Sequence, residues 1–487
     1  MLCVGIRGPS YSEARQQILQ ALSHADIVEF RLDLFSSIDS EALQQLRDEF
    51  SIPMTFTLRS SQQGGQYAQS EESRLSAIRR IASVKPDYLD IEYDVPRSFI
   101  EEVISQHPET KLILSYHNFT ETPQDLDNLY DSLKTTPAFY YKIALMANSP
   151  LDTLRVLNWV QAKADKKLMV MSMGPHGQIS RILAPIVGTP VVYASLDDTQ
   201  QTAPGQLSAP MFVDRYHYKS LNKQSAIYGL IGNPVSQSVS DITHNHLLES
   251  FGINAVYVKI QVQESELPDF FQLAKTLPFK GLSVTMPLKE CVMPCLDHID
   301  PQAKAIGAVN TIVFDKGELI GFNTDAMGAL NALEKEQPVK GKRIVIIGAG
   351  GAAKAIAYEA CQRGGIVTII NRNEEKAKAM ANKFKCHAIG LDRMSECTKN
   401  GYEILINSTP IAMPISADDV LPHTIVMDIK TRAQNSPLYQ EASERGCQIV
   451  PGYLMFVEQA VGQFNLWLNI PSSECYATLK HKTLECV

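Results

Sequence analysis

The sequence predicts an α/β protein in two halves, a closed barrel of eight β/α units followed by a unit of two α/β lobes. Three observations lead to this prediction. The chain has 487 residues, which is too long for one ordinary hydrophobic core. The first half contains eight short apolar segments that alternate with helical patterns. In the second half, an apolar strand at 343–347 leads through a glycine-rich turn into an alanine-rich helix that extends to Arg363.

Composition and charge exclude several classes of protein. Apolar residues make up 45% and charged residues 20% of the chain, as in ordinary globular proteins. The net charge of −8 argues against a nucleic-acid surface and fits a protein that acts on small molecules. No apolar run approaches the length of a membrane span, and the chain begins with a strand-like segment. We therefore expect a cytoplasmic protein with no signal peptide and no membrane partner.

The cysteine pattern predicts neither disulfides nor a metal site. The nine cysteines are an odd number and are scattered, so reduced thiols are expected. Cys291 and Cys295 lie close together in the sequence, but no second pair completes a zinc site.

The eight apolar segments of the first half follow one another at short and regular spacing. Eight β/α units within residues 1–215 are typical of a (β/α)8, or TIM, barrel. The predicted strands are Leu2–Ile6, Ile27–Leu32, Met54–Leu58, Tyr88–Ile91, Lys111–Tyr116, Phe139–Ile143, Leu168–Ser172 and Val191–Ala194.

Polar residues follow or end most of these strands. In such barrels the chemistry lies at the carboxyl ends of the strands, so we expect these side chains to meet at one mouth. They are Glu29, Arg31, Arg59, Glu92, His117, Lys142, Arg181, Thr202 and Gln206.

Lys142 is the strongest candidate among them. It lies in a strand with aromatic and aliphatic neighbours, so it is either desolvated or paired. Desolvation lowers the pKa of a lysine and makes its amine a nucleophile toward carbonyls. The alternative is a structural salt bridge to Glu92 or Glu29 at the barrel mouth.

A histidine and three arginines complete the predicted site. His117 is a natural proton shuttle that Glu92 would orient, although a hydrogen-bonded core histidine is the alternative. Arg31, Arg59 and Arg181 would converge on a substrate that carries a carboxylate. Taken one at a time, each arginine also fits a salt bridge at the rim.

Together these motifs resemble type I 3-dehydroquinate dehydratase over the whole first half. The matching segments are residues 29–33, Thr57-Leu58-Arg59, residues 115–119, Lys142-Ile143-Ala144, Met173-Gly174 with Ser180-Arg181, and residues 203–206. The resemblance implies that Lys142 forms a Schiff base with the substrate ketone. It implies that His117 removes the adjacent proton and assists the loss of a hydroxyl as water. Arg181 and Gln206 would hold the carboxylate and ring hydroxyls, and Thr202 keeps the hydroxyl of the serine that is common in the family.

The second half begins after a polar segment without periodicity, which predicts a linker at 216–225. Ser238 and Ser240 occupy a turn between a strand and a helix, where they would bind an anion or cap the helix. Lys289 follows a proline at a helix start, an unfavourable place for a cation and therefore an indication of function. Asn310 and Asp325 lie at element ends, and Asp325 is alternatively a helix N-cap.

These residues resemble shikimate dehydrogenase from Tyr228 to about Trp467. The most specific segments are the turn at 238–240 and residues 284–289, 307–311 and 321–325. The resemblance implies that Lys289 and Asp325 are the catalytic pair that handles the proton of the reacting hydroxyl. Ser238 and Ser240 would hold the carboxylate, and the ring hydroxyls would contact Thr285, Asn310 and Gln459. Two positions depart from the family: Asp241 replaces a usual proline, and Thr431 replaces a common tyrosine.

The glycine turn in the second half predicts a dinucleotide site in a Rossmann-like lobe. The first glycine, Gly348, makes the tight turn, Gly350 lets the backbone approach a pyrophosphate, and the small Ala353 allows close packing of helix and strand. The phosphates would lie at the helix N-terminus. The alternative is an ordinary turn with chance glycines. The predicted contacts are Gly348, Ala349, Gly350, Gly351 and Ala352.

The next strand indicates which dinucleotide binds. An NAD site usually has an acidic residue at the end of this strand, but here Asn371 and Arg372 stand there, with Lys376 one helical turn later. A guanidinium suits a 2′-phosphate, so NADP is predicted, although a solvated arginine is the alternative. Ser408 and Thr409 end a later strand and would border the cofactor cleft.

The two resemblances imply consecutive reactions. Residues 1–215 would dehydrate 3-dehydroquinate to 3-dehydroshikimate. The second half would reduce that product to shikimate with NADPH. Its catalytic lobe would be residues 226–325, its NADP lobe residues 326–450, and a returning C-terminal helix residues 451–487. The expected partners are these small molecules. A non-catalytic sensor is the first alternative, but Lys142, His117, Lys289 and Asp325 are all present. A second alternative is that the second half oxidises quinate instead of shikimate. Thr431, which replaces the common tyrosine, does not decide between these two substrates.

Overall fold

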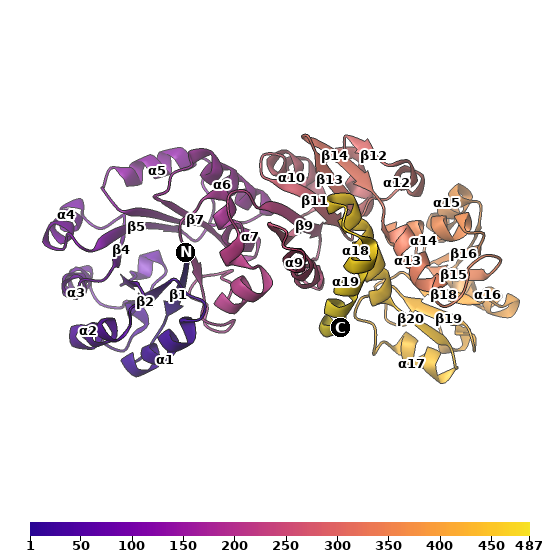
Figure 1. Ribbon diagram of the computed structural model, residues 1–487. Coiled ribbons are helices and arrows are strands. Elements are labelled where there is room, and N and C mark those ends of the chain that lie inside the picture. The colour runs from indigo at the N-terminus through magenta and orange to yellow at the C-terminus, as the bar shows by residue number, and fades with distance from the viewer. The chain divides into compact units, whose positions relative to one another are not determined.

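The computed structural model describes all residues from 1 to 487 (Figure 1). They form two compact units. The first consists of residues 1–226, 254–262 and 269–278, and the second of residues 227–253, 263–268 and 279–487. No helix in either unit combines the length and the apolar character that a membrane span requires.

The first unit contains a parallel eight-stranded sheet that curls into a barrel with helices around it (Figure 1). Its strands are β1 (Leu2–Ile6), β2 (Ile27–Arg31), β3 (Met54–Thr57), β4 (Tyr88–Glu92), β5 (Lys111–Asn118), β6 (Tyr140–Met146), β7 (Leu168–Met173) and β8 (Val192–Ala194). Its helices are α1 (Tyr11–Ala21), α2 (Ser40–Glu49), α3 (Glu71–Ser83), α4 (Arg97–Gln106), α5 (Leu126–Lys134), α6 (Pro150–Lys163), α7 (Gln178–Ile182) and α8 (Ala184–Val187).

The barrel is nearly closed. The strand order is β7-β6-β5-β4-β3-β2-β1-β8, so β7 and β8 are the two ends of the ladder. Strand β8 is short and pairs with β1 only over Leu2–Val4. Because it is short, β8 offers few backbone groups for pairing with a second strand. The eight predicted strands are all present, and the predicted barrel is confirmed.

The barrel interior is apolar beneath its polar mouth. Cys3, Ile113, Met169, Met171 and Tyr193 belong to one buried cluster inside the sheet. Because all strands are parallel, their carboxyl ends meet on the same side of this cluster. The polar residues at those ends are therefore held close together above an apolar floor.

The segment after the barrel is folded rather than extended. Tyr216, Tyr218 and Leu221 are buried, and Tyr218–Ser220 forms a short 3-10 turn. The polar composition predicts a linker here, but three large side chains of this segment are buried in the folded protein.

The second half of the chain contains a mixed sheet and a parallel sheet. The first has strands β9 (Ala226–Gly232), β10 (Ala255–Gln261), β11 (Phe279–Val284), β12 (His298–Ile299), β13 (Thr311–Asp315) and β14 (Glu318–Phe322). The accompanying helices are α9 (Ser240–Ser250), α10 (Leu267–Ala274), α11 (Leu288–Cys291) and α12 (Pro301–Ile306). Strands β13 and β14 form a hairpin, with Lys316 and Gly317 both at positive φ in its turn.

The parallel sheet has the strand order of a Rossmann fold, β17-β16-β15-β18-β19-β20. Its strands are β15 (Arg343–Ile347), β16 (Ile366–Asn371), β17 (His387–Gly390), β18 (Ile404–Asn407), β19 (Ile425–Asp428) and β20 (Gln448–Pro451). Its helices are α14 (Gly351–Gln362), α15 (Glu374–Phe384), α16 (Met394–Asn400) and α17 (Pro437–Glu444), and α13 (Asp325–Glu334) precedes it. The strand order reverses direction between β15 and β18, where such sheets bind ligands.

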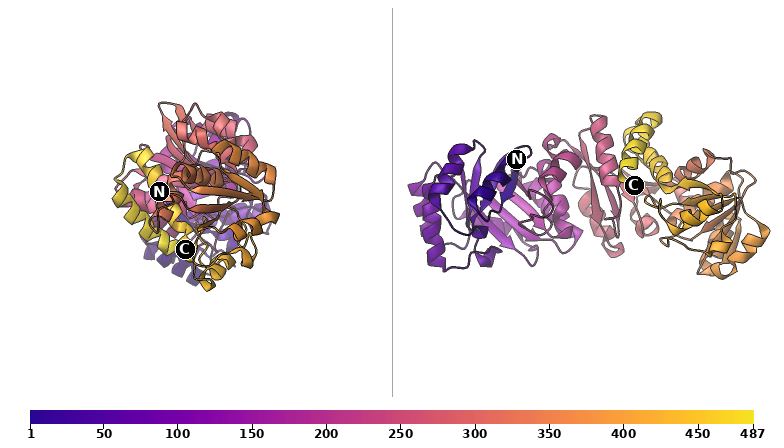
Figure 2. Two further views of the ribbon diagram at one scale, coloured as in Figure 1. Left: turned by 90° about the vertical axis from the view of Figure 1, so that its right-hand side faces the viewer. Right: turned by 90° about the horizontal axis from the view of Figure 1, so that it is seen from below.

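The long helix α18 (Gly452–Leu468) connects this sheet back to the mixed sheet, and α19 (Ser472–Cys486) lies beside it (Figures 1 and 2). Gln463 of α18 is buried, accepts a hydrogen bond from Ser283 Oγ at 3.0 Å and donates to Thr311 Oγ1 at 3.1 Å. Trp467 donates to the Ile312 carbonyl at 3.0 Å, and Gly281 leaves space for its indole ring. Helix α18 is thus fixed to the mixed sheet by polar as well as apolar contacts.

We predict that Gln463→Leu destabilises the second unit by about 1–3 kcal/mol, because it leaves the buried hydroxyls of Ser283 and Thr311 without this partner. Asn465→Leu, at an exposed position of the same helix, is the control and should change stability by less than about 0.5 kcal/mol. Urea unfolding followed by Trp467 fluorescence in a Trp159→Phe background measures both. Equal losses in the two variants would contradict the role of Gln463.

Candidate active sites

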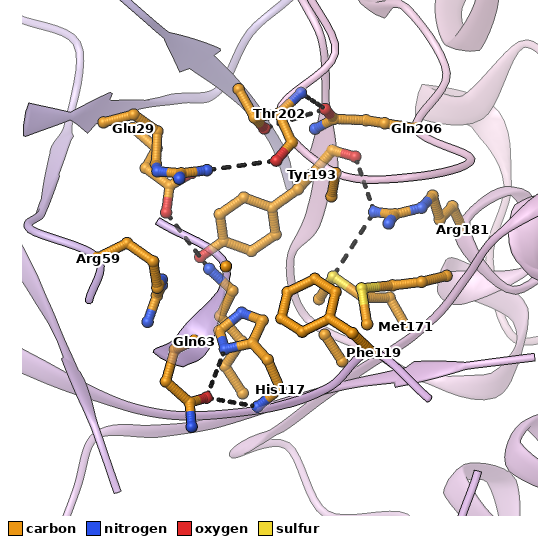
Figure 3. A pocket seen from close by; sticks show the side chains of 16 residues that line it. Glu29, Arg59, Gln63, His117, Phe119, Met171, Arg181, Tyr193, Thr202 and Gln206 are labelled. Atoms are coloured by element: carbon orange, nitrogen blue, oxygen red, sulfur yellow. Dashed lines mark hydrogen bonds and ion pairs between the residues drawn. The ribbon is translucent and has the colours of Figure 1, made fainter. Parts of the chain in front are cut away.

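A pocket opens at the carboxyl ends of the barrel strands (Figure 3). Eight of the nine polar residues predicted at the strand ends line it, and Glu92 does not. The lining residues are Glu29, Arg31, Arg59, Gln63, Gly64, His117, Phe119, Lys142, Ala144, Met171, Met173, Arg181, Tyr193, Thr202, Ala203 and Gln206.

Lys142 lies at the bottom of the pocket, and only 5% of the residue is exposed. Its Nζ is 3.0 Å from Asp90 Oδ2 and 3.3 Å from Glu29 Oε1, and it lies 3.9 Å from the centre of the Tyr193 ring. The lysine is therefore both buried and paired. The expected salt bridge to Glu29 is present, but Asp90 is the second partner in place of Glu92.

Two neighbouring cations keep Asp90 ionised. Burial raises the pKa of this carboxyl, but the charges of Arg59 and Lys142 together bring the pKa well below its ordinary value. Arg59 lies 2.9 Å from Asp90 Oδ1 and donates to Ser115 Oγ at 2.7 Å. Of the two carboxylates beside Lys142, Glu29 is the one that no arginine pairs with, so it is the one placed to take up the proton that the amine must lose before it attacks a carbonyl.

The predicted contact between Glu92 and His117 is wrong. One carboxylate oxygen of Glu92 accepts from Arg74 Nη1 at 2.6 Å, and the other accepts from the backbone N–H of Ser60 at 2.8 Å. The reason is geometric, because Glu92 points toward the loop after β3 and not into the pocket. Glu92 thus holds that loop and does not contact His117 directly.

His117 instead contacts Gln63, a residue that the sequence did not single out (Figure 3). Its Nδ1 lies 3.3 Å from Gln63 Oε1, and its ring stacks on Phe119 at a centroid distance of 6.0 Å. Burial and the positive charges of Arg59 and Lys142 lower the pKa of His117 well below its ordinary value. The imidazole is therefore neutral and available as a base near neutral pH.

Arg181 differs from the other cations of the pocket because no carboxylate neutralises it. It is almost fully buried, and its Nη1 contacts only the Tyr193 carbonyl at 3.3 Å and Met171 Sδ at 3.6 Å. Its Nε and Nη2 have no hydrogen-bond partner in the protein. Burial lowers the pKa of Arg181 to about 10. A buried guanidinium with unused donors is the arrangement that a ligand carboxylate completes.

Arg31 and the loop after β8 form the rim of the pocket. Arg31 makes two 2.9 Å hydrogen bonds to Asp33 and a longer one, at 3.4 Å, to the Thr202 carbonyl. The charge of Arg31 is therefore balanced within the protein. Of the three predicted arginines, Arg31 and Arg59 are paired with carboxylates, whereas Arg181 is not. Gln206 Oε1 accepts from both the N–H and the hydroxyl of Thr202, which directs its amide nitrogen elsewhere.

The second unit brings together the residues predicted for its site. Lys289 Nζ lies 2.5 Å from Asp325 Oδ2, and Asn310 Nδ2 donates to Asp325 Oδ1 at 3.0 Å. Asn310 also lies 3.3 Å from Gln459 Oε1 on α18. Asp325 is buried at the first turn of α13, and its side chain does not cap the helix. The alternative interpretation of Asp325 as an N-cap is therefore wrong.

The predicted carboxylate site lies at the start of α9. Ser238 Oγ and Ser240 Oγ are 2.8 Å apart, and Ser238 Oγ also accepts from the backbone N–H of Ser240, the first residue of α9, at 3.2 Å. The N-cap residue of this helix is Val239. Thr285 follows β11 and packs close to Gly232 at the end of β9. These hydroxyls thus come from neighbouring strand ends of the mixed sheet.

The glycine turn lies at the switch point of the parallel sheet. Gly348 has a φ of +116°, and a Cβ there would lie 2.5 Å from Ser408 Oγ, so only glycine fits. A Cβ on Gly350 would meet nothing within 4 Å, so the space in front of the α14 N-terminus is open. Ser408 and Thr409 border this space, although their hydroxyls bond to the Ile347 carbonyl and to Asn407.

The end of β16 carries the cations predicted for a 2′-phosphate. Arg372 and Lys376 are both exposed, and neither forms an ion pair in the structure. Asn371 donates to the Asn373 carbonyl at 3.0 Å, and Asn373 caps α15. The residues present therefore fit a dinucleotide with a phosphate on its ribose.

The two lobes of the second unit meet beside Lys289. A Cβ on Gly351, the first residue of α14, would lie 3.0 Å from Lys289 Cβ. Lys354 of α14 forms a 2.6 Å ion pair with Glu290. The glycine turn and the Lys289–Asp325 pair are thus two sides of one site.

Comparison with known proteins gives consistent matches over both halves. Residues 2–223 match the family model for type I 3-dehydroquinase. Residues 230–312 match the shikimate dehydrogenase substrate binding domain, and residues 331–431 match shikimate / quinate 5-dehydrogenase.

Similar proteins cover nearly the whole chain. The shikimate biosynthesis protein AroDE of Chlamydia pneumoniae is 38% identical over 96% of this chain and 95% of its own length. The bifunctional 3-dehydroquinate dehydratase/shikimate dehydrogenase of Arabidopsis thaliana is 35% identical over 92% of this chain and 78% of its own. Among solved structures, shikimate dehydrogenase from Aquifex aeolicus is 33% identical and covers 54% of this chain and 98% of its own, with a TM-score of 0.51. A shikimate dehydrogenase in complex with NADP+ is 35% identical over 54% of this chain and 97% of its own, with a TM-score of 0.50.

Two glycine substitutions separate the fold of the turn from its binding role. We predict that Gly350→Ala leaves stability unchanged but weakens NADPH binding about tenfold or more, because the new methyl group occupies the space that a pyrophosphate needs. Gly348→Ala should weaken binding and lower stability together, because its φ is positive and its Cβ would collide with Ser408. NADPH titration and thermal unfolding measure the two effects. Unchanged binding in Gly350→Ala would contradict the placement of the cofactor.

Proposed function

The chain belongs to the family of bifunctional enzymes that join a type I 3-dehydroquinate dehydratase to a shikimate dehydrogenase, and from this premise we propose which residues perform each reaction. The enzyme dehydrates 3-dehydroquinate to 3-dehydroshikimate and reduces that product to shikimate with NADPH. Residues 1–215 are assigned to the dehydratase, 216–225 to the joining segment, 226–325 to the catalytic lobe of the dehydrogenase, 326–450 to its NADP lobe and 451–487 to the C-terminal segment.

Lys142 is the proposed nucleophile of the dehydratase. Its ammonium first transfers a proton toward Glu29, the carboxylate at 3.3 Å that no arginine pairs with, and the amine attacks the substrate ketone. Loss of the carbonyl oxygen as water gives an iminium cation. The two carboxylates and the face of the Tyr193 ring that stabilise the ammonium then stabilise this cation as well.

His117 is the proposed base. It removes the proton from the carbon next to the iminium, and the electron pair passes into the conjugated enamine. His117 then returns the proton to the departing hydroxyl, which leaves as water, and the electron pair of the enamine regenerates the iminium. A water molecule hydrolyses this iminium, which releases 3-dehydroshikimate and the free amine of Lys142. Arg181 holds the substrate carboxylate through its unused Nε and Nη2 donors, and Gln206 is placed for a ring hydroxyl.

Lys289 and Asp325 are the proposed catalytic pair of the dehydrogenase. Lys289 donates a proton to the oxygen of the carbonyl that is reduced, and Asp325 holds the lysine through the 2.5 Å contact. When bound, NADPH supplies the hydride. Ser238 and Ser240 bind the carboxylate, Thr285, Asn310 and Gln459 bind ring hydroxyls, and Arg372 with Lys376 binds the 2′-phosphate. A cytoplasmic location stays a prediction, with which the nine unpaired cysteines agree.

One reciprocal experiment tests both assignments. With 3-dehydroquinate and NADPH, the wild-type enzyme should consume NADPH and release shikimate. Lys142→Ala should consume no NADPH from 3-dehydroquinate but should still reduce added 3-dehydroshikimate. Lys289→Ala should accumulate 3-dehydroshikimate without consuming NADPH. The assignment fails for any half whose lysine variant keeps its own reaction.

Borohydride tests the covalent step directly. Reduction in the presence of 3-dehydroquinate should fix a covalent adduct on the chain, because borohydride converts an iminium into a stable amine. The adduct should be absent from Lys142→Ala and present in Lys289→Ala, as intact mass measurement detects. An adduct that survives in Lys142→Ala would rule out the Schiff base at this residue.

Arg372 should determine the choice of cofactor. We predict that Arg372→Ala weakens NADPH binding about tenfold or more and leaves NADH binding nearly unchanged, because only NADPH carries the 2′-phosphate. Lys378→Ala, on the helix α15 that follows Arg372 but paired with Glu374 and Glu375, is the control and should affect neither. Equal losses for both cofactors in Arg372→Ala would refute the assignment.

A further inference from the structure

Asn407 and Asp428 form a buried side-chain pair at the ends of two neighbouring strands of the parallel sheet. Asn407 ends β18, Asp428 ends β19, and the two residues are aligned in the ladder. Both residues are fully buried, and Asn407 Nδ2 donates to Asp428 Oδ2 at 2.8 Å. Because β18 lies next to β15, the pair lies beside the switch point that holds the glycine turn.

The partners of Asn407 determine the orientation of its amide. Its Oδ1 accepts from the backbone N–H of Thr409 at 3.0 Å and from the Thr409 hydroxyl at 2.8 Å, and a backbone N–H can only donate. Its Nδ2 faces two acceptors, the Ile411 carbonyl at 2.9 Å and the carboxylate of Asp428. Both hydrogens and both lone pairs of the amide are therefore used, and the loop 408–411 folds around this side chain.

Asp428 is held by groups that do not belong to this loop. Its Oδ1 accepts from the backbone N–H of Lys430 at 3.0 Å, and Lys430 Nζ lies 3.8 Å from its Oδ2. A Cβ on Gly452, the first residue of α18, would lie 2.2 Å from the Asp428 carbonyl, so the start of α18 packs directly on this backbone. A carboxylate offers a separate oxygen to each of its two N–H donors, whereas an amide would offer only one.

The loop 408–411 borders the open space in front of α14. A Cβ on Gly348 would lie 2.5 Å from Ser408 Oγ and 3.2 Å from Thr409 Cγ2, so the loop is already close to the glycine turn. The Ser408 hydroxyl donates to the Ile347 carbonyl, and the Thr409 hydroxyl donates to Asn407. A shift of the loop toward α14 would narrow the space that a dinucleotide needs.

We propose that Asn407 and Asp428 are positioning residues for the cofactor, because the buried pair holds the loop 408–411 in the course that keeps the dinucleotide site open. This inference rests on the proposed NADP site and deepens it. The pair lies on β18 and β19, whereas Arg372 follows β16 on the other side of β15. The pair therefore acts on the part of the cofactor that NADPH and NADH share, and Arg372 acts on the 2′-phosphate alone.

Cofactor affinity tests this role. Asp428→Asn keeps the size of the side chain but leaves one of its two N–H donors facing an amide NH2 group. The dissociation constants of NADPH and NADH should both rise about fivefold or more, and by similar factors. Asn407→Asp places two carboxylates against each other and should weaken both cofactors more strongly. Fluorescence titration of the full chain with NADPH and with NADH measures these effects.

Exchange of the two residues gives a sharper test. In the double variant Asn407→Asp/Asp428→Asn, position 428 donates and position 407 accepts, and the N–H groups of Thr409 and Lys430 keep their acceptors. Only the hydrogen bond to the Ile411 carbonyl is lost. The double variant should therefore bind both cofactors more tightly than either single variant. Binding no tighter than in Asp428→Asn would overturn the inference, and this comparison holds even where Asn407→Asp alone fails to fold.

A buried hydrogen-bonding group at the amino end of β18 supplies the control. The Tyr402 hydroxyl is half-way neither to the loop nor to the glycine turn: it donates to the Asp419 carbonyl at 2.5 Å and accepts from the Leu421 N–H at 3.0 Å. Tyr402→Phe should lower the thermal stability of the chain and leave both dissociation constants unchanged. A loss of affinity in Tyr402→Phe equal to that in Asp428→Asn would show that lowered stability alone explains the effect, and would refute the positioning role.

Failure of the inference and failure of the proposed function are distinguishable. Should the wild-type chain bind neither NADPH nor NADH, the proposed cofactor site itself fails. Should the wild type bind NADPH and Arg372→Ala weaken NADPH alone, the site stands, and unchanged affinities in Asp428→Asn then refute only the role of the buried pair.

Discussion

A buried lysine at the end of β6 requires compensation of its charge, and the arrangement of the barrel mouth follows from that requirement. An unpaired ammonium at the depth of Lys142 would cost several kcal/mol, so Glu29 of β2 and Asp90 of β4 lie within 3.3 Å of it. Two carboxylates near one lysine would repel each other, and Arg59 balances Asp90. This chain of pairings ends before Arg181, which is buried without a carboxylate. The unpaired guanidinium leaves the network one negative charge short, and the proposed function assigns that charge to the carboxylate of the substrate.

A different constraint applies to the second unit. One lysine has to lie next to the lobe with the glycine turn without filling the space in front of that turn. Lys289 is paired with Asp325 within the mixed-sheet lobe, and Asn310 orients the same carboxylate from the other side. The helix that follows the glycine turn approaches so closely that a Cβ at residue 351 would lie only 3.0 Å from Lys289 Cβ. A small residue at this position therefore favours the close contact between the two lobes. The ion pair between Glu290 and Lys354 holds the lobes in this contact from the adjoining positions.

The sequence predicts the strands and the polar residues at their ends, but it does not determine which of these residues touch. Asp90 and Glu92 are two positions apart in one strand and so share a face, and the sequence offers no basis for choosing between them as the partner of Lys142. The ladder aligns Glu92 with Ser115 and Ser115 with Lys142. In the folded barrel it is nevertheless Asp90 that contacts the lysine, whereas Glu92 contacts Ser60 and Arg74 after β3. Gln63 lies in a polar turn that resembles any solvated loop, and only the folded chain places its amide against His117. Likewise, Arg31 matches a ligand-binding arginine by type, yet its neighbour Asp33 neutralises it. Secondary structure follows from local pattern, whereas pairing depends on register and on contacts across many residues.

The two lysines lie in different surroundings, and the proposed reactions account for the difference. In the proposed dehydration, Lys142 loses a proton and forms a bond to carbon, and two carboxylates lie beside its amine above the apolar cluster of the barrel. In the proposed reduction, Lys289 keeps its proton until the substrate oxygen takes it, and one carboxylate holds its amine. All residues of the first pocket come from positions 29–206, and the proposed substrate and cofactor residues of the second site come from positions 238–459. Each lysine therefore finds its carboxylate partners within its own half of the chain.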